Sequence, residues 1–332
     1  MRFVAQAVAI GTLTVFGLGY GQNFSQAEVV AFLPEDGPIR FTQDGRRLVT
    51  LYRINEGGRQ TVQAYRLEGD TLVLEDYLRL PRLSYLLAVD GAGRRLVVSA
   101  ESRCNLAEAW PSTRFSLDSS GRLEVMEFPR GRRILRLEAQ SLCGLTYPVF
   151  SPNGRLLAVP NRGGYVQLWD TQTGQLKHTF SGLGRIETVT FSPDGSRLAI
   201  CEQGVAVYAV SSRKLITKLE SSCTGIYPAF TPDGSRLLVA DGKNPVGIWD
   251  LRSGRLERTL PLRAGHAANA LALGQNGTRI VTLDTGRGLS IYDYRSGQTL
   301  FQTAKGGVAL VASPTLEWFA TVAPPQLWRL RQ

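Results

Sequence analysis

Phe191-Ser-Pro-Asp-Gly-Ser-Arg-Leu-Ala-Ile200 is the clearest copy of a phrase that recurs through this chain. It returns as Phe150-Ser-Pro-Asn-Gly-Arg-Leu-Leu-Ala-Val159 and as Phe230-Thr-Pro-Asp-Gly-Ser-Arg-Leu-Leu-Val239. Proline early in the turn holds φ at about −65°, Asp or Asn tolerates the bend, and glycine takes a positive φ. A short apolar run follows, which suits a buried strand. Each copy therefore predicts a strand, a tight turn and a second strand.

The turn glycine marks each copy of the phrase, so its positions count the copies. It falls at Gly45, Gly93, Gly154, Gly195, Gly234 and Gly277, and a degenerate seventh copy has Leu316 in its place. A period of about 40 residues with paired short strands is typical of propeller blades, each of which is a four-stranded sheet. The sequence therefore predicts an all-β fold, a seven-bladed β-propeller of four-stranded antiparallel blades.

One large aromatic residue on the third strand of each unit supports this count. These residues are Tyr65, Phe115, Trp169, Tyr208, Trp249, Tyr292 and Trp328. Asp follows in three units, as in Trp169-Asp170 and Trp249-Asp250, and a turn with glycine comes next. We interpret the aromatic residues as packing between adjacent blades, because aromatic side chains bury large areas.

The turn phrase, an apolar strand and then Leu168-Trp169-Asp170 or Ile248-Trp249-Asp250 together resemble the WD-repeat family. The resemblance covers residues 28–332 and is strongest over 150–260. It implies a propeller that binds other proteins. The Gly-His pair that opens a typical unit of the family occurs only as Gly265-His266, so we identify the chain as similar to a divergent, exported bacterial type. Bacterial propellers of the lactonase-like kind share the same turn phrase.

The two ends of the chain predict how the ring closes. The last unit stops at its third strand and lacks an outer strand, whereas residues 26–33 form a strand that has no unit of its own. We expect residues 26–33 to complete the seventh blade. This arrangement leaves no open sheet edge, which protects against edge-to-edge aggregation.

The first residues have the layout of a secretory signal peptide. An uncharged apolar stretch runs from Phe3 to Gly19, and small and polar residues follow it. We expect a signal peptide over residues 1–24, with an uncleaved membrane anchor as the alternative, and a single propeller over residues 25–332. No later stretch reaches the about 20 apolar residues that a membrane span needs. We therefore expect a monomer that is secreted or periplasmic.

The chain carries a formal net charge of +10, and most of its basic residues are arginines. Arginine recurs just after the turn glycine in most copies. A charge that follows the repeat is spread around the ring, so we interpret these arginines as solvated strand ends. We expect no nucleic-acid partner, because that function predicts a basic stripe on one face. An anionic envelope surface stays open as a partner.

Four cysteines lie in segments that the propeller topology places at one end of the ring. Cys104 and Cys201 follow the second strand of a blade, whereas Cys143 and Cys223 precede the first strand of the next blade. We predict the bonds Cys104–Cys143 and Cys201–Cys223, since export permits disulfides. The alternative is four reduced, buried thiols.

Residues capable of catalysis are scarce. The chain has two histidines, and it has no nucleophile elbow in the mature part, no EF-hand loop and no phosphate-binding glycine loop. We predict no catalytic residue, metal site or cofactor, and we predict a non-catalytic scaffold for another protein or an envelope component. The alternative is a lactonase-like enzyme or small-ligand-binding protein that acts at the central channel.

The candidate binding face lies at the cysteine end of the ring. Loops held by a rigid scaffold commonly carry binding residues, and Trp and Arg commonly anchor interfaces. We predict that Arg103, Trp110 and Arg162 form the centre of this face. Polar neighbours such as Asn161, Glu202 and Asp284 belong to the same predicted loops. The alternative is a solvated rim that binds nothing.

Overall fold

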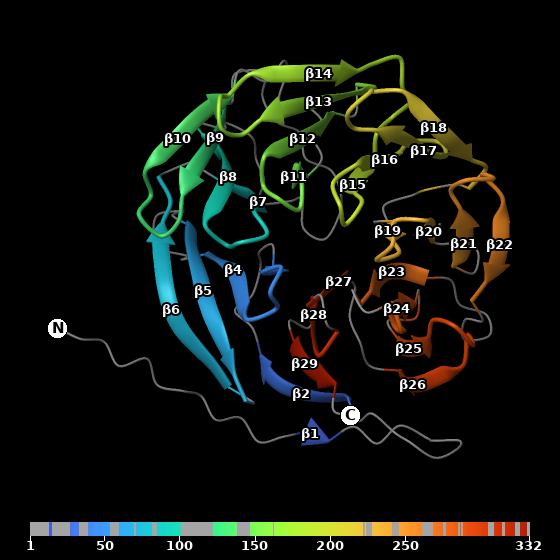
Figure 1. The fold of residues 1–332 in the computed structure, drawn as a ribbon. Coiled ribbons are helices and arrows are strands. Elements are labelled where there is room, and N and C mark those ends of the chain that lie inside the picture. The colour runs from blue at the N-terminus through green and yellow to red at the C-terminus, as the bar shows by residue number, and fades with distance from the viewer. Residues whose placement is uncertain are drawn as a thin grey trace.

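The computed structural model is a ring of seven β-sheets around a central axis (Figure 1). It describes residues 13–14, 27–32, 39–53, 60–69, 71–81, 85–100, 122–137, 147–161, 163–221, 223, 228–240, 246–260, 268–274, 277–284, 286, 288–304, 309–313, 316–322 and 326–330. Over these ranges every regular element is a β-strand, and none is a helix that could cross a lipid bilayer.

Six blades are antiparallel meanders of four strands that run from the centre of the ring to its rim (Figure 1). Blade 1 holds β3 (Ile39–Phe41), β4 (Arg47–Arg53), β5 (Gln60–Glu68) and β6 (Thr71–Arg79), and blade 2 holds β7 (Tyr85–Val89), β8 (Arg95–Ala100), β9 (Arg122–Glu127) and β10 (Arg133–Leu137). Blade 3 holds β11 (Val149–Phe150), β12 (Leu156–Asn161), β13 (Tyr165–Asp170) and β14 (Leu176–Phe180), and blade 4 holds β15 (Thr188–Phe191), β16 (Arg197–Cys201), β17 (Val205–Ala209) and β18 (Leu215–Leu219). Blade 5 holds β19 (Ala229–Phe230), β20 (Arg236–Val239), β21 (Gly247–Asp250) and β22 (Leu256–Thr259), and blade 6 holds β23 (Ala268–Leu273), β24 (Arg279–Asp284), β25 (Leu289–Asp293) and β26 (Thr299–Thr303).

Blade 7 is built from both ends of the chain. It holds β27 (Ala309–Ala312), β28 (Trp318–Val322), β29 (Gln326–Leu330), β2 (Ala27–Phe32) and β1 (Leu13–Thr14). Strand β2 pairs antiparallel with β29, with Ala27 opposite Leu330, so the predicted closure of the ring is confirmed. Strand β1 pairs outside β2 and gives this sheet a fifth strand, which the sequence did not predict.

The turn between the first and second strands repeats the same backbone geometry around the ring. Gly195 has a φ of 73°, and its N–H donates to the Ser192 carbonyl at 2.8 Å. Leu316 in blade 7 also has a positive φ, 55°, and donates to the Ser313 carbonyl at 2.9 Å. The degenerate seventh copy therefore forms the same turn without glycine.

Apolar side chains fill every junction between adjacent blades as a separate cluster. The junction of blades 2 and 3 contains Val97, Leu157 and Trp169, and the junction of blades 6 and 7 contains Phe319 and Trp328. In each case the aromatic residue of the third strand packs toward the preceding blade. Burying one such side chain contributes about 1.5–3 kcal/mol, so the seven junctions supply the apolar core of the ring.

Blade 2 departs from the predicted aromatic pattern. The sequence placed Phe115 on its third strand, but that strand is β9, and Phe115 lies outside the described residues. Met126 stands opposite Leu96 in β9, as Trp169 stands opposite Leu157 in blade 3. The prediction was wrong because the long segment between β8 and β9 shifts the third strand further along the chain, and a flexible Met fills the space.

Candidate functional site

The ring has two ends with different kinds of connection. At the turn end, the first strand of each blade turns into the second and the third turns into the fourth. At the loop end, the second strand connects to the third, and each blade connects to the next. The sequence placed the candidate binding face at the loop end.

Cys201 and Cys223 are bonded to each other at the loop end, with their Cα atoms 5.7 Å apart. Cys201 ends β16, and Cys223 lies in the connection from β18 to β19. Both side chains are buried in the apolar cluster between blades 4 and 5. The bond therefore ties the last residue of a second strand to the link between two blades. The predicted partners Cys104 and Cys143 lie outside the described residues.

The three predicted anchors Arg103, Trp110 and Arg162 also lie outside the described residues. The strand ends that flank them are described. Strand β8 ends at Ala100 in blade 2, and β12 ends at Asn161 in the adjacent blade 3. Both strands end at the loop end, so the two segments leave the ring from neighbouring blades.

The described polar residues of the predicted loops hold the loops themselves. Asn161 Oδ1 accepts from the Gly163 N–H at 2.6 Å, and Asp284 Oδ1 accepts from the Gly288 N–H at 2.8 Å. Glu202 Oε2 accepts from the Gly184 N–H at 2.5 Å. Within the residues that the structure describes, no group of three His, Cys, Asp or Glu side chains could hold a metal ion.

The turn end carries a side-chain hydrogen-bond network in the first turns of blades 1, 3, 4 and 5. Ser192 Oγ donates to Asp194 Oδ1 at 2.5 Å and accepts from the Arg197 N–H at 2.9 Å. Asp194 Oδ1 also accepts from the Ser196 N–H at 3.0 Å. The hydrogen bond from Ser192, more than any other contact, lowers the pKa of Asp194 to about 2.

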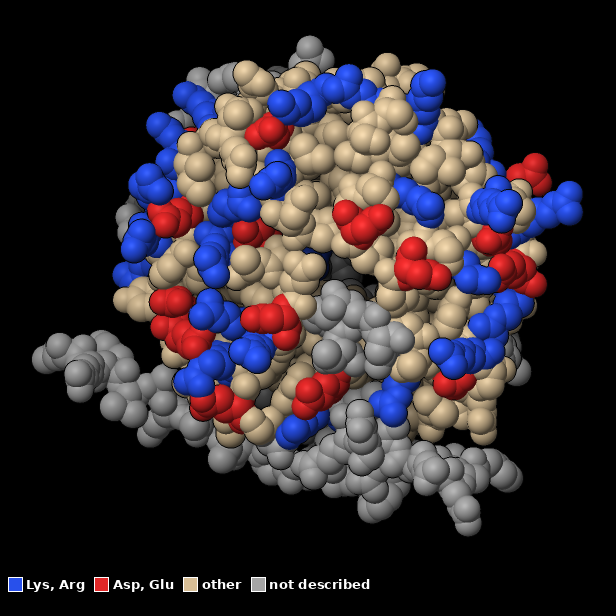
Figure 2. Space-filling view, viewed as in Figure 1, with Lys and Arg blue, Asp and Glu red and all other residues tan. Residues whose placement is uncertain are grey.

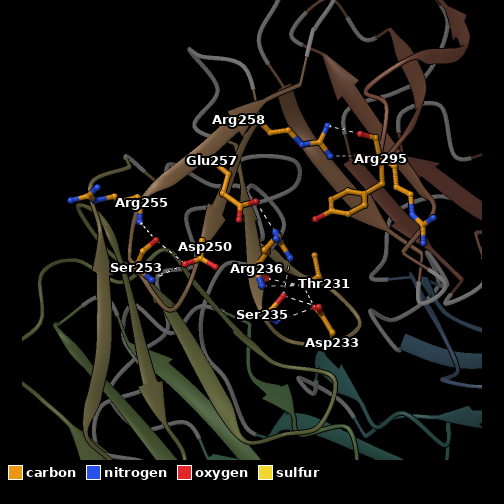
Figure 3. Close-up of polar contacts among 11 residues, drawn as sticks. Thr231, Asp233, Ser235, Arg236, Asp250, Ser253, Arg255, Glu257, Arg258 and Arg295 are labelled. Atoms are coloured by element: carbon orange, nitrogen blue, oxygen red, sulfur yellow. Dashed lines mark hydrogen bonds and ion pairs between the residues drawn. The ribbon is translucent and has the colours of Figure 1, made fainter.

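Blade 5 repeats this network at Thr231 and Asp233 (Figure 3). There the hydrogen bond from Thr231 is the main cause that lowers the pKa of Asp233 to about 2. Asp250 follows Trp249 and receives the Ser253 N–H and hydroxyl at 2.7 Å each, so this Asp holds the second turn of its blade (Figure 3). Asp170 does the same in blade 3 through two backbone N–H groups at 2.9 Å.

The arginines that follow the turn glycine fall into two classes, which the sequence analysis did not separate. The second residue after the glycine makes structural contacts: Arg95 pairs with Asp90 at 3.0 Å, Arg236 pairs with Glu257 at 2.6 Å, and Arg197 donates to the Gly234 carbonyl of the next blade. The first residue after it, as at Arg94 and Arg155, is exposed. The description as solvated strand ends therefore fails for the arginines at the second position after the glycine. The signal that could have separated them is the offset of one residue.

Comparisons with known proteins agree with the fold. No protein-family model matches the chain. An uncharacterized WD repeat-containing protein of Deinococcus radiodurans is 27% identical over 257 residues, which cover 67% of this chain and 92% of that protein. Transducin beta-like protein 3 of Rattus norvegicus is 27% identical over 46% of this chain, and telomerase protein component 1 of the same organism is 25% identical over 50%.

The chain spans only 21% of transducin beta-like protein 3 and 6% of telomerase protein component 1, so these two similarities concern the repeats alone. The repeats, the closed ring of seven blades and the WD repeat-containing relatives support the same conclusion. The chain is a seven-bladed β-propeller that is similar to WD repeat-containing proteins.

Proposed function

We propose that this protein is a non-catalytic scaffold that binds another protein or a component of the cell envelope. The proposal rests on one observation: at both ends of the ring, described polar side chains bind the backbone of their own loops and turns. Asn161, Glu202 and Asp284 hold loops, and the turn acids hold turns. A rigid ring whose loop and turn acids bind its own backbone suits presentation of loops rather than chemistry.

The WD repeat-containing relatives support the same function. We place the binding face at the loop end, on the segments that carry Arg103, Trp110 and Arg162. Affinity capture of the tagged protein from its own cells, after mild cross-linking, tests this function. One reproducible protein partner, lost when these three residues are changed together to Ala, is the expected result.

The matched control changes three exposed arginines of the turn end, Arg252, Arg255 and Arg295, together to Ala. This control should retain the partner. If the variant with Arg103, Trp110 and Arg162 changed to Ala still captures the partner, the binding face lies elsewhere on the ring. Capture of no protein above background would contradict the scaffold function.

We also propose that the protein is exported to the cell envelope or medium after removal of residues 1–24. The apolar stretch of the N-terminal segment and the disulfide at Cys201–Cys223 support this proposal. Intact-mass measurement of protein from the envelope and the medium tests it. An N-terminus between residues 19 and 27 is expected, whereas the full mass in the membrane fraction would identify an anchored receptor instead.

A further inference from the structure

Two outward-facing positions of the first turn differ in charge from blade to blade. The residues before and after the turn glycine are Ala92 and Arg94 in blade 2, Asn153 and Arg155 in blade 3, Asp194 and Ser196 in blade 4, and Asp233 and Ser235 in blade 5. Among these four blades the carboxylate is missing in the two that have the arginine, whereas blade 1 has both, as Asp44 and Arg46. The same turn therefore presents a positive charge on blades 2 and 3 and a negative charge on blades 4 and 5.

The arginine charges of blades 2 and 3 face solvent. Arg94 and Arg155 are exposed, and neither side chain has an ion-pair partner within the described part of the chain. The serines of blades 4 and 5 behave differently, because the hydroxyls of Ser196 and Ser235 each donate to the carboxylate of their own turn at 2.7 Å. The positive side chains are therefore available to a partner.

A partly buried arginine network holds the turns of blades 2 and 3 together. Arg95 donates to Asp90 Oδ2 at 3.0 Å and, across the junction, to Thr171 Oγ1 at 3.1 Å. Thr171 Oγ1 donates in turn to the Gly154 carbonyl at 2.6 Å. A Cβ atom at Gly154 would collide with the Arg95 guanidinium. Fixed turns lose little freedom when a partner binds, which favours affinity.

The second turn of blade 2 extends the positive surface. Arg130 and Arg132 have side chains that are 78% and 73% exposed, and both pair with Glu127, at 3.3 and 2.9 Å. Two guanidinium groups against one carboxylate leave an excess positive charge. The Phe128 N–H donates to the Arg94 carbonyl at 2.7 Å, which places this turn beside the first one. Figure 2 shows basic side chains over β8, β9 and β10, as well as elsewhere on the rim.

We infer that the turn end of blades 2 and 3, with Arg94, Arg155, Arg130 and Arg132, binds an acidic segment of a partner protein. This inference rests on the proposed scaffold function and names the chemistry of a partner. It adds a second binding surface, at the opposite end of the ring from the face predicted around Arg103 and Arg162.

The extent of the positive surface favours a short acidic segment over a larger polyanion. Acidic side chains also lie near the central opening of this face (Figure 2). Asp194 and Asp233 of the next two blades are exposed carboxylates. A nucleic acid or an anionic membrane laid across the ring would meet these carboxylates, and like charges in contact are unfavourable.

Fluorescence anisotropy with a fluorescein-labelled oligoglutamate peptide tests the inference on the full protein. Arg94→Ser and Arg155→Ser, made together, introduce the residue that blades 4 and 5 already have in this turn, so the fold should be kept. Arg252→Ser and Arg295→Ser form the matched control, because both are exposed arginines of blades 5 and 6 and remove the same charge. Thermal unfolding verifies that both variants are folded.

We expect the Arg94/Arg155 variant to weaken oligoglutamate binding about tenfold, since two rim charges of about 0.7 kcal/mol each amount to this factor. The control should change the dissociation constant less than about twofold. Equal weakening by both variants, or no binding by the unchanged protein, would overturn the inference. Tighter binding to phosphatidylglycerol vesicles or to an oligonucleotide, lost in the same variant, would assign the surface to a lipid or nucleic acid instead.

The peptide assay contains no cellular protein, so its outcome is separate from the capture experiment. Suppose that oligoglutamate binding depends on Arg94 and Arg155 but no cellular protein is captured. The scaffold function would then be contradicted, whereas the anion affinity of this surface would be confirmed. A captured partner that is indifferent to both arginines, with no peptide binding, would overturn the inference alone.

Discussion

The indole N–H of the third-strand tryptophan has a hydrogen-bond acceptor in blade 7 but not in blade 3. Trp328 Nε1 donates to Thr321 Oγ1 at 3.2 Å. Val159 stands at the position of blade 3 that corresponds to Thr321, and over the described ranges the buried Trp169 Nε1 has no acceptor. A buried donor without a partner costs about 1–3 kcal/mol. Blade 3 therefore has room for one stabilising substitution.

We expect Val159→Thr to keep the free energy of unfolding unchanged or raise it by about 1 kcal/mol, because the hydroxyl would accept from Trp169. Val98→Thr is the matched control: Val98 is equally buried at the same position of blade 2, where Met126 has no N–H to donate. This control should lose about 1–2 kcal/mol. Denaturant unfolding measures both values, and equal losses would contradict the explanation.

Leu316 combines two opposing requirements at one residue. Its φ of 55° favours glycine, whereas its side chain is 1% exposed in the cluster between blades 6 and 7. Removing a buried Leu side chain costs about 2–5 kcal/mol, and a left-handed backbone costs a non-glycine residue about 1–2 kcal/mol. The gain from burial exceeds the backbone cost, which explains why this copy of the turn retains Leu.

We expect both Leu316→Gly and Leu316→Ala to destabilise the protein, with Gly about 1 kcal/mol less harmful than Ala because it relieves the backbone. Leu237 in β20 is buried in an ordinary strand and should show the reverse order, since glycine there costs more entropy. Thermal or denaturant unfolding of the four variants gives the order. The same order at both sites would exclude the backbone explanation.

At the scale of elements, the first turns of blades 4 and 5 each link two inner strands through an ionised carboxylate, Asp194 or Asp233. The pKa of Asp194 and of Asp233 in the folded protein is about 2, below the ordinary value of 3.8. A lowered pKa in the folded state stabilises the protein above the unfolded pKa, and this contribution is lost as pH falls through the folded pKa. Both side chains are exposed, so each contribution is small.

We expect the melting temperature of the unchanged protein to fall between about pH 4 and about pH 2 partly because these two carboxylates become protonated. The variant with Asp194→Asn and Asp233→Asn should show a shallower fall over this range. Blade 3 already has Asn153 in the same turn, so the fold accepts the change. Parallel melting curves for the two proteins would contradict this assignment.

At the scale of the whole molecule, stability depends on a closed ring. Seven separate apolar clusters join neighbouring blades, and the last blade is completed by β2 from the other end of the chain. Removing β2 would expose the unpaired edge of β29. Exposed edges pair with other chains and promote aggregation.

Deletion of residues 22–34 should therefore cause unfolding or aggregation, as measured by melting temperature and solubility. Deletion of residues 1–21 is the control, because it leaves β2 whole and should preserve both properties. A protein without residues 22–34 that melts and dissolves like the control would disprove closure by this strand.

The disulfide adds a covalent constraint between blade 4 and the link to blade 5. Thiol titration of the denatured, unreduced protein should find at most two free thiols, since Cys201 and Cys223 are bonded. Changing both to Ser should lower the free energy of unfolding by up to about 3 kcal/mol for a loop of this length. Four free thiols would refute both the bond and the argument for export.

The repeat made most of the fold predictable. Turn chemistry is local, because proline, Asp and glycine act within a few residues, and the period then counted the blades and revealed the unpaired strand at residues 26–33. The candidate face was less accessible to this reasoning. The sequence places Arg103, Trp110 and Arg162 between the predicted strands, where no periodic pattern constrains the backbone.

Contacts across blade junctions came from the three-dimensional arrangement. Arg95 is the second residue after its turn glycine, but this offset does not reveal that its side chain reaches Thr171, 76 residues away. Met126 likewise takes an aromatic position that no local pattern marks. Composition and spacing report on neighbours along the chain. Which side chains meet across a junction depends on how two twisted sheets face each other, and that relation exists only once the ring has closed.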